Sequence, residues 1–346
     1  MKMKISFLVT YYNQEQYVRQ SLDSILSIDK PDDWEILVGD DGSNDGTVEI
    51  VNEYIKRFPD EIKLFVMPRE ESEEVDFVKR ASANRLNLLE HCSGDCFCTL
   101  DGDDFYIDSS FVKEAISIFE KKSNISIVSF GYKYFKDGML QGEELLPYQT
   151  DQQIETEDYI NNRYLHAGAC VYKIAWDKNR IDYLKNIGFF DDNDIVINSL
   201  SYGDMYYLNR PVYAYRQTGK SIYTSMKRLE QAVLNTLGYD VDKLLIDSSY
   251  TDALTNRYGS AILTMYVWRK RIKVKLGEAM YNRYLNTCKK IPDAISYKLL
   301  NYQNLENNEI TEVNKVIQVL QKQSLMYTKI VLKYVINRIQ SLFDRK

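Results

Sequence analysis

Acidic side chains are concentrated in a four-residue segment that directly follows an apolar run. Asp101-Gly102-Asp103-Asp104 comes after residues 96–100 and before Phe105 and Tyr106. Two or three carboxylates at the end of a strand can hold Mn²⁺ or Mg²⁺ and leave positions for phosphate oxygens and water. An acidic turn that caps a helix beginning near Ser110 explains the same residues equally well. A calcium loop of the EF-hand type does not, because Phe105 and Tyr106 stand where an oxygen ligand and a glycine are needed.

A second acidic segment, residues 40–47, reads Asp-Asp-Gly-Ser-Asn-Asp-Gly-Thr. Asp45 or Thr47 can cap the next helix, but capping explains one acid and not three. Because a carboxylate only accepts hydrogen bonds, Asp41 is suited to the imide N–H of a uracil ring. No G-x-G-x-x-G pattern follows any apolar run, which excludes a Rossmann dinucleotide site.

Short apolar runs alternate with segments of helical period through the first part of the chain. This alternation predicts an α/β fold, a mostly parallel sheet flanked by helices. Ligands bind such sheets at the carboxyl ends of the strands, where the acidic segments follow. The predicted strands are residues 4–10, 35–38, 62–66, 96–100 and 125–130, and the predicted helices include 16–26 and 47–58.

Taken in order, three segments resemble the family-2 glycosyltransferases, which have the GT-A fold. The segments are residues 10–13 (Thr-Tyr-Tyr-Asn), residues 40–47, and Gly94-Asp95 leading into residues 100–104. The resemblance covers roughly residues 1–225 and implies a Rossmann-like catalytic domain. It also implies an inverting, metal-dependent hexosyltransferase that uses a nucleotide-sugar, with UDP favoured, and an acceptor hydroxyl on a glycan or lipid-linked saccharide. Bacterial surface polysaccharide synthesis is the usual setting of such enzymes.

The resemblance also assigns roles to residues. It implies that Asp41 contacts the base, that Asp103 binds the Mn²⁺ or Mg²⁺ ion, and that Asp101 contacts the ribose or the metal. Thr10 and Tyr12 then line the nucleotide pocket. The full set of predicted nucleotide-sugar-binding residues is Thr10, Tyr12, Asn13, Asp40, Asp41, Ser43, Asp101, Gly102, Arg216 and Lys220.

Residues 189–198 resemble the family's Glu-Asp segment, with Asn193 in place of the glutamate. The aspartate of that pair is the general base in the family, which makes Asp194 the first candidate. Asp191 and Asp192 are close rivals. An acidic helix start capped by Asp191 or Asp192 is the purely structural alternative.

Farther along, residues 210–216 and Ser221 resemble the family's stretch that ends in Tyr-Arg and a later serine. Many relatives have a histidine where this chain has Thr218, so that a metal ligand is missing here or replaced by water. Arg216 and Lys220 can direct charge at phosphate instead. His166 falls in a region that faces the acceptor in relatives. With only two histidines in the chain, a serine–histidine hydrolase is not expected.

The formal net charge of −6 argues against a general nucleic-acid binder. Five cysteines, an odd number, and no leader-like start predict reduced thiols and a cytoplasmic protein. Residues 226–346 are expected to form a helical region beside a catalytic domain of residues 1–225. Within it, residues 267–275 and 322–346 interleave basic and apolar side chains. They can pack on the protein, form a homodimer, or lie on the inner face of the cell membrane; these alternatives stay open.

Two other functions remain to be weighed. A catalytically silent nucleotide-sugar-binding scaffold would fit the Thr218 and Asn193 replacements. A phosphotransferase with Asp101 as nucleophile is disfavoured, because Phe105 stands where a small hydroxyl or a valine is needed.

Overall fold

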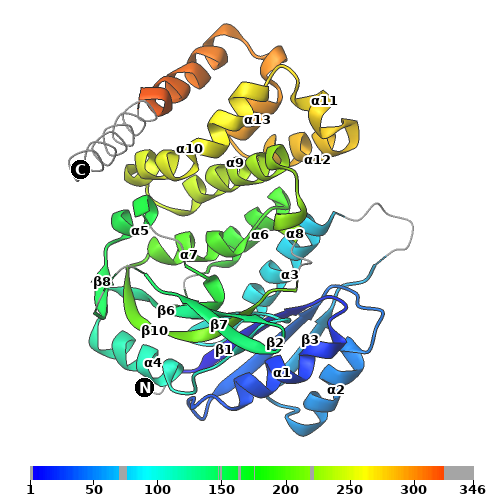
Figure 1. The fold of residues 1–346 in the computed structure, drawn as a ribbon, viewed down its shortest axis with the longest axis vertical. Helices are drawn as coiled ribbons and strands as arrows, with labels where there is room; N and C mark the ends of the chain where they lie inside the picture. Colours follow the sequence, from blue (N-terminus) through cyan, green and yellow to red (C-terminus); the bar gives the residue numbers. More distant parts are fainter. Residues whose placement is uncertain are drawn as a thin grey trace, which may run out of the picture. The chain divides into compact units, whose positions relative to one another are not determined.

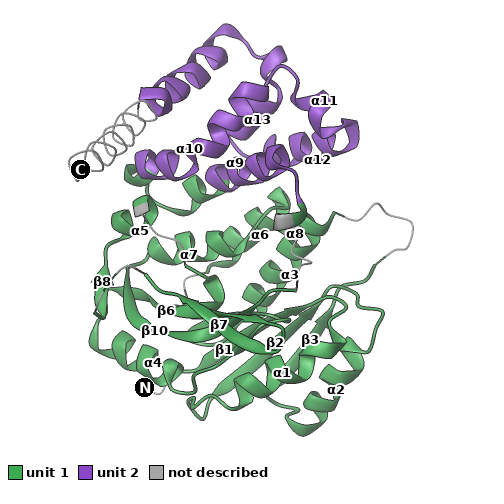
Figure 2. Ribbon diagram, in the orientation of Figure 1, with its two compact units in different colours: residues 1–225, 241–250 green, residues 226–240, 251–346 purple. Residues whose placement is uncertain are grey.

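The computed structural model describes residues 3–69, 76–146, 148, 150–162, 165–174, 176–218 and 222–322. Figure 1 shows the ribbon of the chain. The contacts divide the chain into two compact units (Figure 2). The first comprises residues 1–225 and 241–250, and the second comprises residues 226–240 together with residues from 251 onward. The division of labour predicted for residues 1–225 and 226–346 stays a prediction.

The first unit is built on a ten-stranded sheet with the order β3-β2-β1-β4-β9-β6-β10-β5. The pairs β1–β2, β2–β3, β1–β4 and β6–β10 are parallel, whereas β9 runs antiparallel to both β4 and β6. Two further strands pair with this path, β7 with β6 and β8 with β10. The strands are β1 Ile5–Tyr11, β2 Trp34–Asp40, β3 Ile62–Val66, β4 Cys96–Asp101, β5 Phe105–Tyr106, β6 Ile125–Lys136, β7 Met139–Glu144, β8 Gln152–Ile154, β9 Cys170–Lys173 and β10 Asp204–Arg216.

Helices cover both faces of this sheet (Figure 1). Alternate residues of β1 point to opposite faces. Ile5, Phe7 and Val9 pack in the core with side chains of α1 and α4, whereas Leu8 faces α3 and α7. The helices of the first unit are α1 Glu15–Leu26, α2 Thr47–Arg57, α3 Phe77–His91, α4 Phe111–Lys121, α5 Thr156–Asn162, α6 Lys178–Ile187, α7 Asp192–Leu200 and α8 Ile222–Ser225. This architecture confirms the α/β fold class and the mostly parallel sheet.

The second unit is helical in its described part. Its helices are α10 Thr251–Trp268, α11 Ile272–Leu276, α12 Glu278–Cys288, α13 Ile295–Leu300 and the first part of α9 Arg228–Leu245. Asp240 of α9 accepts hydrogen bonds from the backbone N–H groups of Ile295 and Ser296, both at 2.9 Å, and so fixes the start of α13. None of the described helices combines the length and apolar character that crossing a membrane requires.

Candidate active site

The acidic segments lie together at one edge of the sheet, because three adjacent strands run parallel and end there. Asp40, Tyr11 and Asp101 close β2, β1 and β4, and Thr10 of β1 is in register with Gly39 on one side and Asp101 on the other. Gly39 must be a glycine, since a Cβ atom would lie 2.0 Å from Oδ1 of buried Asn84. The parallel order therefore brings the predicted loops side by side.

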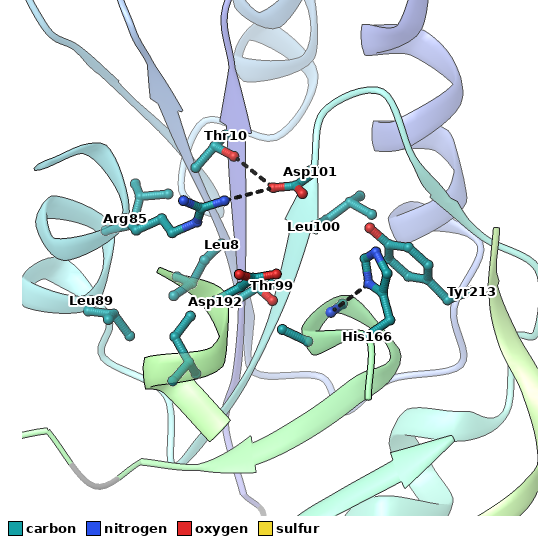
Figure 3. A pocket seen from close by; sticks show the side chains of 14 residues that line it. Leu8, Thr10, Arg85, Leu89, Thr99, Leu100, Asp101, His166, Asp192 and Tyr213 are labelled. Carbon is teal, nitrogen blue, oxygen red and sulfur yellow. Dashed lines mark hydrogen bonds and ion pairs between the residues drawn. The ribbon is translucent and has the colours of Figure 1, made fainter. Parts of the chain in front are cut away.

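A pocket opens at this edge and is lined by charged side chains from three elements (Figure 3). Thr10 Oγ1 donates to Asp101 Oδ1 at 3.4 Å, and Arg85 Nη2 of α3 lies 3.7 Å from the same oxygen. Asp192, at the start of α7, lines the same pocket, as does His166. The structure thus brings Asp101 and Asp192, predicted separately, into one pocket.

Arg85 is a site residue that sequence reasoning missed. Burial lowers the pKa of Arg85, but the charges of Asp101, Asp192, Asp191 and Asp194 outweigh that effect and raise it. Its guanidinium is therefore a fixed positive charge amid the acids of the pocket. The only signal in the sequence was a basic residue on the half-buried face of α3, next to Asn84.

The Asp101–Asp104 turn presents its carboxyl groups differently. Burial and the charge of Asp101 raise the pKa of Asp103 to about 6. Asp104 is buried and accepts from the Tyr213 hydroxyl at 2.7 Å and from the backbone N–H of Arg216 at 2.6 Å. Gly102 packs against Tyr11, whose ring would lie 2.1 Å from a Cβ atom there. Asp104 and Gly102 thus shape the turn, while Asp101 and Asp103 carry its available negative charge.

Asp101 and Asp103 fit a divalent cation held by few protein ligands. The Arg216 guanidinium donates to the backbone oxygen of Asp103 at 2.5 Å rather than to its carboxylate, and to Gln20 at 2.6 Å. The mutual repulsion of the two acids is therefore left for a cation to relieve, with diphosphate oxygens and water as further ligands. In the described part of the chain, no cluster of three or more His, Cys, Asp or Glu side chains forms a ready-made metal site.

The residue 10–13 and 40–47 loops are joined by backbone-to-side-chain hydrogen bonds. The Asn13 N–H donates to Ser43 Oγ and the Asn44 N–H donates to Asn13 Oδ1, both at 2.8 Å. Asn13 has a φ of 49°, a left-handed conformation that asparagine tolerates. Asp40 is fully buried and accepts from the Ser43 N–H at 2.8 Å and hydroxyl at 2.5 Å. Asn13, Asp40 and Ser43 therefore build the loops, and a contact of theirs with a nucleotide remains a prediction.

Asp41 is held by two arginines that the sequence did not single out. Arg69 Nη2 and Arg80 Nε each lie 2.5 Å from one of its carboxylate oxygens. Arg69 also lies over the Tyr12 ring, 3.7 Å from its centroid, and donates to the Tyr12 hydroxyl at 2.8 Å. A flat, partly exposed surface of Tyr12 and Arg69 thus adjoins a carboxylate, a combination suited to stacking and pairing with a base.

The three acids at the start of α7 have different positions. Asp191 is the N-cap: its Oδ1 accepts from the Asp194 N–H at 3.1 Å, while Asp194 Oδ2 accepts from the Asp191 N–H at 2.7 Å. Asp194 is fully buried, so in this capping box it does not reach the pocket. Asp192 does line the pocket. The geometry therefore moves the proposed general base from Asp194 to its rival Asp192, and the Asp191 cap bears out part of the structural alternative.

This buried carboxyl cluster should make stability depend on pH. Burial and the charges of Asp192 and Asp242 raise the pKa of Asp191 to about 7, and burial with the charges of Asp191 and Asp242 raises that of Asp194 further. A carboxyl with a raised folded-state pKa stabilises the fold at low pH, and this contribution is lost as pH rises through that pKa.

We therefore expect the unfolding free energy to fall between pH 5 and pH 8. Asp194→Asn, which removes one buried charge, should make that fall smaller by about 1 kcal/mol or more, the equivalent of one pKa unit. Urea titrations of both proteins at the two pH values measure it. Equal declines in the two proteins would contradict the assignment.

His166 lies at the pocket, where its ring packs 4.6 Å from the Tyr213 ring (Figure 3). Burial lowers the pKa of His166 despite the nearby charges of Asp101 and Asp192, which favours the neutral imidazole. Arg216 packs over Tyr17 and Phe135, with its guanidinium carbon 4.5 Å and 4.6 Å from their centroids. Lys220, Ser221 and residues 323–346 of the C-terminal segment lie outside the described residues.

Comparison with known proteins identifies the family of this chain. Residues 6–180 match the model of glycosyl transferase family 2. The chain belongs to glycosyl transferase family 2. Among family members, the putative glycosyltransferase EpsE of Bacillus subtilis is 31% identical over 144 residues, which cover 42% of this chain and 48% of EpsE.

A second relative is the UDP-Glc:alpha-D-GlcNAc-diphosphoundecaprenol beta-1,3-glucosyltransferase WfgD of Escherichia coli. It is 27% identical over 143 residues, 41% of this chain and 51% of WfgD. The chain thus spans about half the length of EpsE and WfgD.

The fold of this family-2 chain is shared with a solved structure, S. aureus TarS 1–349. The two align with a TM-score of 0.56 at 16% identity, over 93% of this chain and 92% of TarS 1–349. TarS 1–349 in complex with UDP-GlcNAc aligns with the same TM-score. At this identity the likeness confirms the GT-A-type architecture and the presence of a helical C-terminal region.

Proposed function

We propose that this chain is an inverting transferase that moves a sugar from a UDP-sugar to a hydroxyl of a glycan or lipid-linked saccharide. The observation that carries the proposal is the pocket in which Asp192 and Asp101 stand with Arg85 at the carboxyl edge of the sheet. The name of WfgD specifies a UDP-glucose donor and a diphosphoundecaprenol-linked acceptor for that relative. A role in bacterial surface polysaccharide synthesis is proposed on the same basis.

Each side chain of the pocket has a distinct task in the proposed reaction. Asp192 accepts the proton of the acceptor hydroxyl as that oxygen attacks the anomeric carbon, and a single displacement inverts the configuration. Arg85 keeps Asp101 and Asp192 ionised by its fixed positive charge. Asp101 and Asp103 would hold Mn²⁺ or Mg²⁺, which when bound neutralises charge on the leaving diphosphate.

Nucleotide binding is proposed at the other end of the site. Asp41 with Tyr12 and Arg69 offers an acceptor carboxylate beside a flat surface, which suits uracil better than a purine. A thermal-shift panel of UDP, GDP, CDP and dTDP, each with and without Mn²⁺, tests this assignment. We expect UDP with Mn²⁺ to give the largest stabilisation. A larger shift with GDP would overturn the uridine assignment but not the family.

A surface of the second unit is proposed to contact anionic membranes. Val274 and Val267 are 85% and 70% exposed, and Lys275 lies 4.9 Å from the centroid of Trp268. Five basic residues and no acidic ones occur in residues 267–275. Exposed apolar side chains among basic ones are typical of surfaces that bind anionic lipid.

Replacing Lys270 and Lys275 with glutamine should weaken binding to phosphatidylserine vesicles roughly 30-fold, because each basic residue near such a surface contributes about 1 kcal/mol. Vesicle flotation measures it. The matched control is Lys289→Gln with Lys315→Gln, two exposed lysines of the same unit. Equal weakening by both pairs would contradict a local surface, and a concentration-dependent dimer without flotation would favour the homodimer alternative.

A further inference from the structure

Four tyrosines form a patch on one face of the central strands β6 and β10. Tyr132 is in register with Tyr213, and Tyr134 with Tyr215. The Tyr132 ring meets the Tyr134 ring edge-on with centroids 5.5 Å apart, and the Tyr215 ring lies 6.2 Å from each of them. Tyr132, Tyr134 and Tyr215 are only half-buried, so ring surface remains accessible.

His166 packs against this patch. Its ring centroid lies 4.6 Å from that of Tyr213, 5.0 Å from that of Tyr215 and 5.2 Å from that of Tyr132. The Gly168 N–H donates to His166 Nδ1 at 3.2 Å. In a neutral imidazole whose Nδ1 accepts a hydrogen bond, the proton is on Nε2, so Nε2 is a donor.

The patch is continuous with the pocket. His166 and Tyr213 line the pocket together with Asp101 and Asp192. Burial raises the pKa of Tyr215, and the charges of Asp104, Asp103, Asp101 and Asp192 raise it further. The Tyr215 hydroxyl therefore lies in the field of both acidic groups, close to where the sugar would be transferred.

We propose that Tyr132, Tyr134, Tyr215 and His166 form the subsite for a pyranose ring of the acceptor. Aromatic rings offer a flat, rigid apolar surface at low entropic cost, to which the C–H face of a pyranose is complementary. The His166 Nε2–H and the tyrosine hydroxyls then bind the hydroxyls of the sugar. Pockets of this kind combine aromatic walls with a few polar groups that fix orientation.

The order of strands assigns the patch to the acceptor rather than to the donor. Along the sheet, the proposed base-binding residue Asp41 follows β2, the carboxylates Asp101 and Asp103 follow β4, and the patch lies on β6 and β10. The nucleotide, the diphosphate and the acceptor would thus be bound in sequence across the sheet. This inference rests on the proposed function, because it needs Asp101 and Asp103 at the diphosphate.

Saturation-transfer NMR tests the subsite with the full chain, UDP and Mn²⁺. The probes are the methyl glycosides of glucose, galactose, mannose and N-acetylglucosamine. We expect at least one glycoside to receive saturation in its ring protons. Tyr134→Ala should weaken its binding about fivefold, the value of one aromatic contact. The exposed tyrosine variant Tyr202→Ala should not, and Tyr134→Leu, which keeps apolar volume, separates ring loss from damage to the fold.

The outcomes distinguish this inference from the function on which it rests. Failure of UDP to bind the unaltered protein would overturn the proposed function itself. UDP binding without transfer to any glycoside, or equal weakening by Tyr134→Ala and Tyr202→Ala, would overturn only the subsite. A Tyr134→Ala variant that lost affinity for UDP-sugar but not for UDP would show that the patch binds the donor sugar, and would likewise overturn the acceptor assignment.

Discussion

Asp192→Asn should lower the rate of sugar transfer by about 10² to 10⁴, the usual contribution of a general base. The asparagine keeps the size of the side chain but cannot accept the acceptor proton. Because Asp192 lies away from the Asp41 end of the site, the affinity for UDP should change little. Steady-state rates of UDP release with saturating donor, together with calorimetry for UDP, measure the two effects separately.

Asp194→Asn is the matched comparison for this prediction. Asp194 is two residues away but fully buried in the capping box of α7. Its replacement should change stability more than rate, with a loss in rate of less than about tenfold, below the range expected for a base. If instead Asp194→Asn abolished transfer in a folded protein and Asp192→Asn did not, the first assignment from sequence would be restored.

Asp103→Asn should remove the response to Mn²⁺ and lower kcat/KM about 10²-fold or more. A divalent ion at a developing phosphate charge contributes several kcal/mol, and each 1.36 kcal/mol corresponds to a tenfold change in rate. The amide is a weaker ligand and leaves Asp101 as the only carboxylate of the pair. Rates measured over a Mn²⁺ titration check this expectation.

Asp95→Asn serves as the control for Asp103→Asn. Asp95 precedes β4, at the opposite end of that strand, and accepts from the Lys4 N–H at 2.8 Å. It should keep the full Mn²⁺ response. A wild-type response to Mn²⁺ in Asp103→Asn would mean that the metal, if used, is held elsewhere, as the threonine at position 218 already makes conceivable.

The strands and the acidic edge could be predicted because their signals are local. The apolar runs at residues 4–10, 35–38, 62–66, 96–100 and 125–130 all fall within strands of the structure. Parallel order then follows from the alternation with helices, and it brings the loops after β1, β2 and β4 together. The antiparallel strand β9 was not predicted, because a four-residue strand inside a long connection carries little periodic signal.

The choice among Asp191, Asp192 and Asp194 could not be made from sequence. All three acids fit a helix start, and which side chain faces the pocket depends on where the helix begins. The capping box between Asp191 and Asp194 settles that geometry and leaves Asp192 pointing elsewhere. Arg69, Arg80 and Arg85 were missed for a similar reason: their partners Asp41 and Asp101 are distant in the chain.

A catalytically silent scaffold remains the alternative of a different class. It would share Asp41, Tyr12 and the acidic turn, and would bind UDP without turnover. The presence of Asp192 in the pocket favours an enzyme, because an unneeded carboxylate beside Asp101 would only add repulsion.

The most direct test is nucleotide release from UDP-glucose, UDP-galactose and UDP-N-acetylglucosamine by the full chain, with Mn²⁺ and with Asp192→Asn in parallel. The proposed function predicts Mn²⁺-stimulated UDP release from one of these donors, and its loss in Asp192→Asn. Binding of UDP without release from any donor, or release that Asp192→Asn leaves unchanged, would contradict it.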